Sequence, residues 1–412
     1  MNIIVVGASH AGISFADAMR RNGFAGGLTL IDSQPGLPLE RPPLSKAFLQ
    51  SEDSDNDARF ALRDAGWFDA NNVTLIDGVT VAGIDAPAHS ITLDDGRALS
   101  YDKLVLATGA APRQLAAHLD GVFVLRDPDD ARRLRAGLSD AQSAIIIGGG
   151  YIGLEVAASL IKLGKKVTVI EAADRVLARV ASPLISSHFA DLHSSSGAVL
   201  HVGSAVEDII GDDGTFTGVV MADGSHLAAD MLVVGIGVLP RTEVARLAGA
   251  EIGNGIQVNA SMQTNAKDIY AIGDVALIAD DLRDDLAGGL GGRIESVHNA
   301  SDSAERAAAA INGHAPPTPQ APWFWSEQYH ARLQSAGLVP VPGDKVRYVR
   351  RPGKREPGFS VWSFEGDALK AIEAVGDPAG YMLGKKCLER GLSPDPDQLG
   401  DSAFDLKGFA AG

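Results

Sequence analysis

The sequence predicts an α/β protein with two similar domains, each built on a parallel sheet covered by helices. Two observations carry this prediction. One glycine-rich turn follows the apolar residues 3–7, and a second follows a similar apolar run that begins at Ser143. Each turn leads into a stretch of helix length and then into another short apolar run, and alternating elements of this kind form parallel sheets. Since 412 residues exceed what one hydrophobic core usually serves, two or three domains are expected.

The first of these units begins at the N-terminus. Residues 3–7 resemble a buried parallel strand, residues 11–22 are expected to be helical, and residues 28–32 form the next strand. The turn between strand and helix reads Gly-Ala-Ser-His-Ala-Gly from Gly7, and it matches Gly-x-Gly-x-x-Gly except that Ser9 replaces the middle glycine. We interpret the histidine of this turn as structural. Asp32 ends the second strand, where an acidic side chain can bind a ribose hydroxyl.

The second unit carries a complete fingerprint. Gly-Gly-Gly-Tyr-Ile-Gly starts at Gly148, and the following strand, Val167–Glu171, ends in an acid. A carboxylate at that position accepts hydrogen bonds from the adenosine ribose and repels a 2′-phosphate, so Glu171 favours NADH over NADPH. Two fingerprints in one chain imply two nucleotides, as hydride transfer from nicotinamide to flavin requires.

Turn signals divide the remaining sequence. Residues 93–96 and 222–224 have the composition of hairpin turns, and the proline-rich residues 316–322 resemble a linker. A third domain of short strands and a terminal helical segment is expected after that linker.

Charge argues against several classes of partner. The 36 basic and 52 acidic residues give a net charge of −16, which disfavours nucleic acid or an anionic membrane surface. No apolar run approaches the roughly 20 residues of a membrane helix, and the N-terminus enters a strand without a basic leader. The expected location is the cytoplasm.

The cysteine content excludes further chemistry. Cys387 is the only cysteine, so no internal disulfide, Cys-x-x-Cys pair, thiolate zinc site or cysteine-bound iron–sulfur cluster can form, and no metal site is expected. Disulfide reductases and cysteine-dependent peroxidases need a cysteine beside the flavin in the first domain. Because none precedes residue 387, these classes are excluded.

Several motifs in order resemble those of the oxygenase-coupled, NADH-dependent ferredoxin reductases. They are Arg-Pro-Pro-Leu-Ser-Lys at 41–46, Ala-Thr-Gly at 107–109, the second fingerprint through Glu155, Tyr-Ala-Ile-Gly-Asp at 270–274, Arg-Ile-Glu-Ser at 293–296 and Trp-Phe-Trp-Ser at 323–326. The resemblance covers essentially the whole chain. It implies a glutathione-reductase-like fold, in which an NAD-binding domain (111–235) is inserted into an FAD-binding domain (1–110 and 236–318), followed by a C-terminal α+β domain (319–412).

The resemblance also implies an activity. Such an enzyme takes a hydride from NADH onto FAD and passes electrons singly to a [2Fe–2S] ferredoxin, plant-type or Rieske, which serves an oxygenase of the P450 or Rieske type. The alternative is an NADH-binding flavoprotein like apoptosis-inducing factor, which shares the fold and a lysine–glutamate pair but has no ferredoxin partner.

Residue roles follow from the same resemblance. Lys46 and Glu155 are expected to be the catalytic pair, because a lysine stabilises the negative charge of reduced flavin and, when buried, needs an acidic partner. Either Asp32 or Ser33 serves the FAD ribose, and Trp323 is expected to be a core residue. The positions assigned to FAD are Gly7, Ala11, Gly12, Asp32, Ser33, Arg41, Lys46, Val81, Ala107, Thr108, Gly109, Arg126, Gly273, Asp274, Glu295, Val297 and Trp325. The positions assigned to NADH are Gly148, Gly150, Tyr151, Ile152, Gly153, Glu155, Glu171, Gly235, Ile236 and Gly237.

Ferredoxins are usually acidic, so docking on this acidic protein requires a local basic surface. The sequence offers one cluster within 345–355 and three lysines further on. We expect the docking surface to include Lys345, Arg347, Arg350, Arg351, Lys354 and Arg355, together with Lys385, Lys386 and Lys407.

Overall fold

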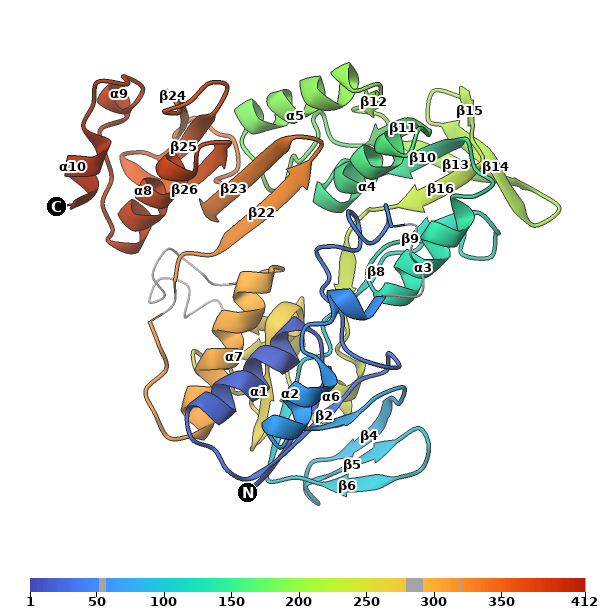
Figure 1. The fold of residues 1–412 in the computed structure, drawn as a ribbon, viewed down its shortest axis with the longest axis vertical. Coiled ribbons are helices and arrows are strands. Elements are labelled where there is room, and N and C mark those ends of the chain that lie inside the picture. The colour runs from blue at the N-terminus through green and yellow to red at the C-terminus, as the bar shows by residue number, and fades with distance from the viewer. Residues whose placement is uncertain (52–56, 279–291, 319, 412) are drawn as a thin grey trace. The chain divides into compact units, whose positions relative to one another are not determined.

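The computed structural model describes residues 1–51, 57–278, 292–318 and 320–411, and these form two compact units (Figure 1). Unit 1 contains Met1–Glu40, Asp53–Ala111 and Leu239–Pro322. Unit 2 contains Arg41–Glu52, Pro112–Val238 and Trp323–Gly412. Two of the passages of the chain between the units lie in the short strands β8 (Ala110–Pro112) and β17 (Val238–Pro240), which pair with each other. The finer division into three domains stays a prediction.

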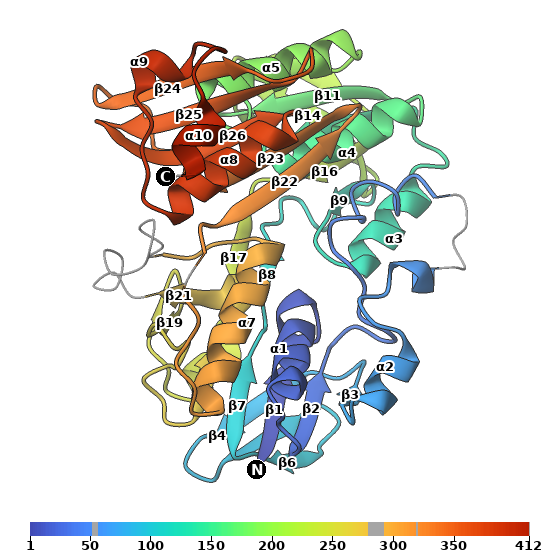
Figure 2. The same ribbon diagram turned by 60° about the vertical axis from the view of Figure 1, so that its left-hand side comes forward.

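Unit 1 is built on a five-stranded parallel sheet of order β20-β7-β1-β2-β3. Its strands are β1 (Asn2–Val6), β2 (Gly27–Ile31), β3 (Thr74–Ile76), β7 (Lys103–Leu106) and β20 (Ile269–Ala271). Helix α1 (His10–Arg21) joins β1 to β2, which confirms the predicted strand–turn–helix–strand unit. Helix α7 (Val297–Ile311) packs beside α1, as both views show (Figures 1 and 2).

Smaller elements complete unit 1. The strands β4 (Val81–Asp85), β5 (Ser90–Leu93) and β6 (Ala98–Ser100) form an antiparallel sheet, and the predicted turn at 93–96 joins the last two. A third sheet contains β18 (Ile252–Gly253), β19 (Gly255–Val258) and β21 (Ala276–Ile278). The short helices are η1 (Asp57–Phe60), α2 (Ala65–Ala70), α6 (Glu243–Leu247) and η2 (Gly273–Val275).

Unit 2 repeats the parallel architecture in the order β12-β11-β10-β16-β9. Its strands are β9 (Val122–Val124), β10 (Ser143–Ile147), β11 (Lys166–Glu171), β12 (Val199–Val202) and β16 (Met231–Val234), and its helices are α3 (Pro128–Gly137), α4 (Tyr151–Lys162) and α5 (Pro183–Ser195). The antiparallel strands β13 (Val206–Asp212), β14 (Thr215–Met221) and β15 (His226–Ala228) adjoin it, and the predicted turn at 222–224 joins β14 to β15. The second predicted strand–turn–helix–strand unit is therefore also present.

The C-terminal part of unit 2 is an antiparallel sheet of order β22-β23-β26-β25-β24. The strands are β22 (Trp323–Gln328), β23 (Ala331–Gly337), β24 (Val346–Pro352), β25 (Phe359–Glu365) and β26 (Ala368–Val375). Helix α8 (Pro378–Glu389) packs on β26 and β23, and the short helices α9 (Pro396–Leu399) and α10 (Leu406–Ala411) follow (Figure 2). The core between sheet and helices includes Trp362, Phe364, Ile372 and Cys387. Residue 319 of the predicted linker lies outside the described residues.

Throughout the described ranges, no helix is both long enough and apolar enough to span a bilayer.

A buried carboxylate joins the C-terminal sheet to α5. Glu373 on β26 is fully buried, and both of its oxygens accept hydrogen bonds from the backbone N–H of Ser182, the residue before α5, at 3.1 and 3.2 Å. Burial raises the pKa of Glu373 to about 7, against the smaller opposing effects of Ser182 and the Arg175 charge. The protonated form is therefore the stable one in the folded protein up to nearly neutral pH.

We predict that Glu373→Gln changes how stability depends on pH. A carboxyl group whose pKa is raised on folding stabilises the protein below its unfolded value of 4.5, and that stability is lost as the pH rises through about 7. Glutamine does not titrate, so the free energy of unfolding of the variant relative to wild type should rise by about 2 kcal/mol between about pH 5 and pH 8. Urea denaturation at several pH values measures this. The exposed Glu365→Gln is the control, and parallel pH profiles for Glu373→Gln and wild type would contradict the prediction.

Candidate functional site

Each glycine fingerprint begins at a residue whose backbone only glycine adopts easily. Gly7 and Gly148 have φ of 107° and 109°. A Cβ at Gly7 would collide with the carbonyl oxygen of Ala107, and one at Gly148 would collide with that of Gly235. The first glycine of each motif is therefore required both for the turn and for the close approach of a neighbouring strand end.

The last glycine of each motif is required for packing between helix and turn. Gly12 in α1 lies against the carbonyl oxygen of Gly7, and Gly153 in α4 lies against that of Gly148. A Cβ at either position would overlap the oxygen, so the two helices can start this close to their strands only with glycine there.

Both helices begin in a way that suits a phosphate ligand. The N-cap residue of α1 is Ser9, whose side chain does not cap the helix, and that of α4 is Gly150, which has no side chain to do so. The N-terminus of a helix carries partial positive charge and first-turn N–H groups that bind phosphate. The two turns therefore fit the pyrophosphates of two dinucleotides, which is what the fingerprints predicted.

In each unit, an acidic residue at the end of the next strand accepts a hydrogen bond from the backbone of the glycine-rich turn. Asp32 accepts a hydrogen bond from the backbone N–H of Ala8 at 2.7 Å, and Glu171 accepts one from that of Gly149 at 2.7 Å. Asp32 lies in unit 1 and Glu171 in unit 2, yet the geometry is the same. Ser33, the other candidate for the FAD ribose, has an exposed side chain. Each carboxylate is therefore held at the turn where the ribose of a bound nucleotide is expected.

The remaining predicted FAD residues of unit 1 lie at strand and helix ends. Gly273 in η2 approaches α1 so closely that a Cβ there would lie 2.8 Å from the Ala11 side chain, and its N–H donates to Ser303 of α7 at 2.9 Å. Ala107, Thr108 and Gly109 follow β7, and Asp274 follows Gly273 in η2. Val297 is the first residue of α7, and Glu295, two positions before it, pairs with Arg293. Val81 is buried at the start of β4. The end of β7, η2 and the start of α1 thus gather in one region of unit 1.

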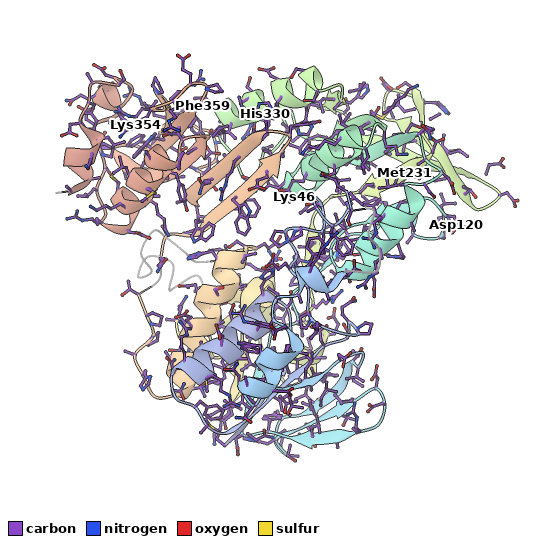
Figure 3. The ribbon with its side chains drawn as sticks, viewed as in Figure 1. Lys46, Asp120, Met231, His330, Lys354 and Phe359 are labelled. Atoms are coloured by element: carbon purple, nitrogen blue, oxygen red, sulfur yellow. The ribbon has the colours of Figure 1, made fainter. Side chains whose placement is uncertain are left out.

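Unit 2 contains the predicted ion pair. The Nζ of Lys46 lies 2.6 Å from the Oε2 of Glu155, whose side chain is 3% exposed (Figure 3 labels Lys46). Two serines that the sequence analysis did not single out complete the surroundings of the carboxylate. Ser45 donates to Oε2 at 2.5 Å, and Ser326 donates to Oε1 at 2.7 Å. The carboxylate therefore has a cation and two hydroxyl donors in place of the water it loses on burial.

Glu155 belongs to a row of three residues on one face of helix α4. Tyr151, Glu155 and Ser159 are one helical turn apart and share a face. Tyr151 packs on Phe324 with ring centroids 4.4 Å apart, and Ser159 donates to the backbone carbonyl of Ser45 at 2.6 Å. The same face therefore contacts both the 41–52 segment and β22.

The other predicted residues of unit 2 are assigned either to FAD or to NADH. Arg41 donates to the carbonyl oxygen of Arg126 at 3.1 Å, so these two FAD-assigned residues lie together. Trp325 is half-buried on β22, on the opposite face from Ser326. The NADH-assigned residues Gly148, Gly150, Tyr151, Ile152, Gly153, Glu155, Glu171, Gly235, Ile236 and Gly237 all belong to unit 2. The FAD-assigned residues are divided, with Arg41, Lys46, Arg126 and Trp325 in unit 2 and the rest in unit 1.

Two further expectations concern Trp323 and metal binding. Trp323 is half-buried and packs against the C-terminal core, with its ring 5.5 Å from that of Trp325. Over the part of the chain that the structure describes, no group of three or more His, Cys, Asp and Glu side chains could hold a metal ion.

Comparison with protein families identifies the chain. Residues 1–304 match the model of the pyridine nucleotide-disulphide oxidoreductases, and residues 323–410 match the reductase C-terminal domain. The chain belongs to the pyridine nucleotide-disulphide oxidoreductase family. The predicted fold of two dinucleotide-binding domains with a C-terminal α+β domain is the fold of this family, and its members use FAD and NAD(H).

Relatives of known name match over the full length. Rhodocoxin reductase from Rhodococcus erythropolis is 40% identical over 99% of this chain and 94% of its own. The crystal structure of a ferredoxin reductase from Rhodopseudomonas palustris is 38% identical, with a TM-score of 0.93 and 99% of each chain covered. Putidaredoxin reductase, in its covalent complex with putidaredoxin, is 36% identical with a TM-score of 0.91, covering 100% of this chain and 98% of that one. The resemblance on which the sequence analysis relied is confirmed.

Membership of the family does not bring disulfide chemistry to this chain. Its only cysteine, Cys387, is buried in the C-terminal core, and burial raises the pKa of the thiol. A thiol of that kind is a poor nucleophile.

We predict that Glu171→Gln narrows the preference for NADH over NADPH by about tenfold. Glu171 accepts from the backbone N–H groups of Gly149 and Ala173, and glutamine keeps one carbonyl acceptor for them. The substitution removes a charge that repels a 2′-phosphate by about 1–2 kcal/mol at a partly exposed site. The ratio of kcat/KM values for the two cofactors measures the change. Glu207→Gln, at an exposed position in the same unit, is the control. An unchanged ratio would show that Glu171 only supports the turn.

Proposed function

We propose that this protein is an NADH-dependent ferredoxin reductase that supplies electrons to an oxygenase. The observation that carries the proposal is similarity over the whole chain, C-terminal domain included, to reductases that serve such systems. Both fingerprints and the Lys46–Glu155 pair agree with it. Bound FAD supplies the chemistry that turns one hydride into single-electron steps.

The residues of the two units take separate parts in this reaction. The turn at Gly7 would bind the FAD pyrophosphate and Asp32 its ribose, while the turn at Gly148 and Glu171 would do the same for NADH. Lys46 would place a positive charge where reduced flavin becomes negative, a form of electrostatic stabilisation. Glu155 keeps that lysine in one position and compensates its charge.

The acceptor in this proposal is a [2Fe–2S] ferredoxin of the plant or Rieske type, and through it an oxygenase. The cytoplasm is the proposed location. No nucleic acid or membrane takes part in the proposed reaction.

The predicted docking cluster at 345–355 does not form one surface. In β24, an edge strand, Arg347 and Arg351 lie on one face, and both contact the C-terminal segment, although half of the Arg347 side chain stays exposed. Arg347 pairs with Asp397 at 2.6 Å, and Arg351 donates to the carbonyl oxygens of Leu399 and Asp401 at 2.6 Å each. These two arginines interact with the C-terminal segment, so we leave them out of the proposed docking surface.

Arg350 lies on the opposite face of β24, and Lys354 lies in the turn between β24 and β25. Arg350 lies over the ring of Phe359, 4.4 Å from its centroid, while Lys354 is exposed near the turn that leads to that strand (Figure 3 labels Lys354 and Phe359). The basic residues at 345–355 are thus spread over two faces and a turn.

A second basic group has the properties expected of a docking surface. Around α8, a cavity of about 450 Å³ is lined by Trp323, Tyr381, Met382, Gln334, three cationic side chains (Arg332, Lys385 and Lys386) and one acid, Glu389, which lies 3.5 Å from Lys385. The Met382 side chain is 68% exposed, and the Nζ of Lys385 lies 5.9 Å from the centre of the Trp323 ring. An exposed apolar residue beside cations suits an acidic protein partner. We place the proposed ferredoxin docking surface here.

We predict that Lys46→Met slows reduction of bound FAD by NADH at least tenfold, because it removes the cation and leaves the buried Glu155 without a counter-charge. Anaerobic stopped-flow measurement of flavin bleaching tests this. Lys103→Met is the matched control, since it also breaks a partly buried lysine–aspartate pair, with Asp268 at 2.5 Å in unit 1. Equal rates in the two variants would remove Lys46 from the reaction, and wild-type protein that NADH does not reduce would remove the proposed function.

We predict that Lys386→Glu lowers ferredoxin reduction about tenfold at low salt, and that the defect shrinks as ionic strength rises, because salt screens the attraction over a Debye length of about 8 Å. Reduction of cytochrome c through a [2Fe–2S] ferredoxin measures turnover, and NADH–ferricyanide activity is the control for flavin reduction. Lys354→Glu, at an equally exposed site, should have the smaller effect. Loss in Lys354→Glu without loss in Lys386→Glu would move the docking surface to the β24–β25 hairpin.

A further inference from the structure

Strand β22 delivers two polar side chains into the interior of unit 2. Ser326 and Gln328 are both completely buried, and they alternate along the strand with the exposed Glu327. Ser326 donates to the Oε1 of Glu155 at 2.7 Å, and the Nε2 of Gln328 donates to the hydroxyl of Ser326 at 3.1 Å. Buried polar groups of this kind are costly unless each one finds a partner.

The chain of hydrogen bonds continues to helix α5. The Nε2 of His193, also completely buried, lies 2.8 Å from the Oε1 of Gln328, and its Nδ1 lies 3.2 Å from the hydroxyl of Tyr329. Burial lowers the pKa of His193, so the imidazole is neutral near pH 7 and carries a single N–H. Five side chains from three elements and a turn, from Tyr329 to Glu155, are therefore linked in series.

The charge at one end sets the direction of every bond in this chain. Ionised Glu155 accepts only, so the single proton of Ser326 must point to it, and Ser326 can then only accept from Gln328. If the Gln328 amide were reversed, its oxygen and Glu155 would compete for that one proton. The carbonyl of Gln328 therefore faces His193, which must hold its proton on Nε2 and accept from Tyr329 on Nδ1.

We propose that Ser326 is a positioning residue for Glu155, and that Gln328 and His193 fix the orientation of its hydroxyl. Glu155 is then held at both oxygens, by Ser326 at Oε1 and by Ser45 and Lys46 at Oε2. A carboxylate fixed at both oxygens in turn fixes the ammonium of Lys46. The inference rests on the proposed function, since it is there that Lys46 acts on bound FAD.

The chain positions groups and does not conduct protons. The Gln328 amide stands between His193 and Ser326, and a side-chain amide neither gains nor loses a proton near neutral pH. The expected effect therefore concerns the charge held beside the flavin. Hydrogen bonds that all point toward an anion also polarise one another, which strengthens the hydrogen bond from Ser326 to Glu155.

The first experiment uses the wild-type protein with FAD bound and labels its histidines with ¹⁵N. The nitrogen chemical shifts should show His193 as the neutral Nε2–H tautomer near pH 7. The Nδ1–H tautomer or a charged imidazole would break the directional chain and overturn the proposal. This measurement does not depend on NADH, on ferredoxin or on any variant.

The second experiment compares Ser326→Ala with Ser363→Ala. Ser363 is equally buried in the same sheet, but within the described residues its hydroxyl has no hydrogen-bond partner, so its removal breaks no bond. In Ser326→Ala we expect a more negative midpoint potential of bound FAD and a reduction by NADH about fivefold slower, with the Kd for NADH unchanged. Ser363→Ala should match wild type in both.

The outcomes separate the two proposals. If wild-type protein is reduced by NADH but Ser326→Ala has the potential and rate of Ser363→Ala, Ser326 has no positioning role. If wild-type protein is not reduced by NADH, the proposed function fails, while the tautomer of His193 still decides whether the chain exists.

Discussion

A buried carboxylate determines how unit 2 is assembled. Glu155 is 3% exposed, and an ionised group taken out of water is stable only when a counter-charge and hydrogen-bond donors replace the solvent. The donors come from the 41–52 segment and from β22, which lie far from Glu155 in the sequence. This requirement contributes to the grouping of residues 41–52 with 112–238 and 323–412 in one compact unit, together with the burial of Leu44, Phe48 and Leu49, although the neighbours of the segment on both sides belong to unit 1.

The two glycine turns show which parts of the fingerprint the backbone requires. The first and last glycines of each motif cannot carry a Cβ without striking a carbonyl oxygen. The middle position is different, since a Cβ at Gly150 would meet nothing within 4 Å. Ser9 occupies the corresponding place in the first turn, and the helix still begins there. The departure that the sequence analysis noted in the first fingerprint is therefore compatible with the same turn geometry.

The sequence predicted what depends on neighbours along the chain, and missed what depends on distant ones. Both turns and both flanking strands were predicted from the local pattern. The Lys46–Glu155 pair joins distant positions, and it was the resemblance to the ferredoxin reductases that predicted it. The hydrogen bond from Ser326 spans 171 positions, and nothing local marks that serine as buried. The cluster at 345–355 appears uniform in sequence, but strand alternation sends Arg347 and Arg351 to one face and Arg350 to the other.

The position of the cysteine decides where electrons can leave the protein. Members of a family named for disulphide chemistry need a reactive thiol for it, yet Cys387 lies in the core between α8 and the C-terminal sheet, with its pKa raised by burial. The chain therefore has no redox-active cysteine pair to receive electrons from the flavin. The C-terminal domain instead contributes a surface on which Met382, Lys385 and Lys386 gather beside Trp323. A protein without such a pair passes its electrons to an external acceptor, and in the function that we propose this surface receives an acidic ferredoxin.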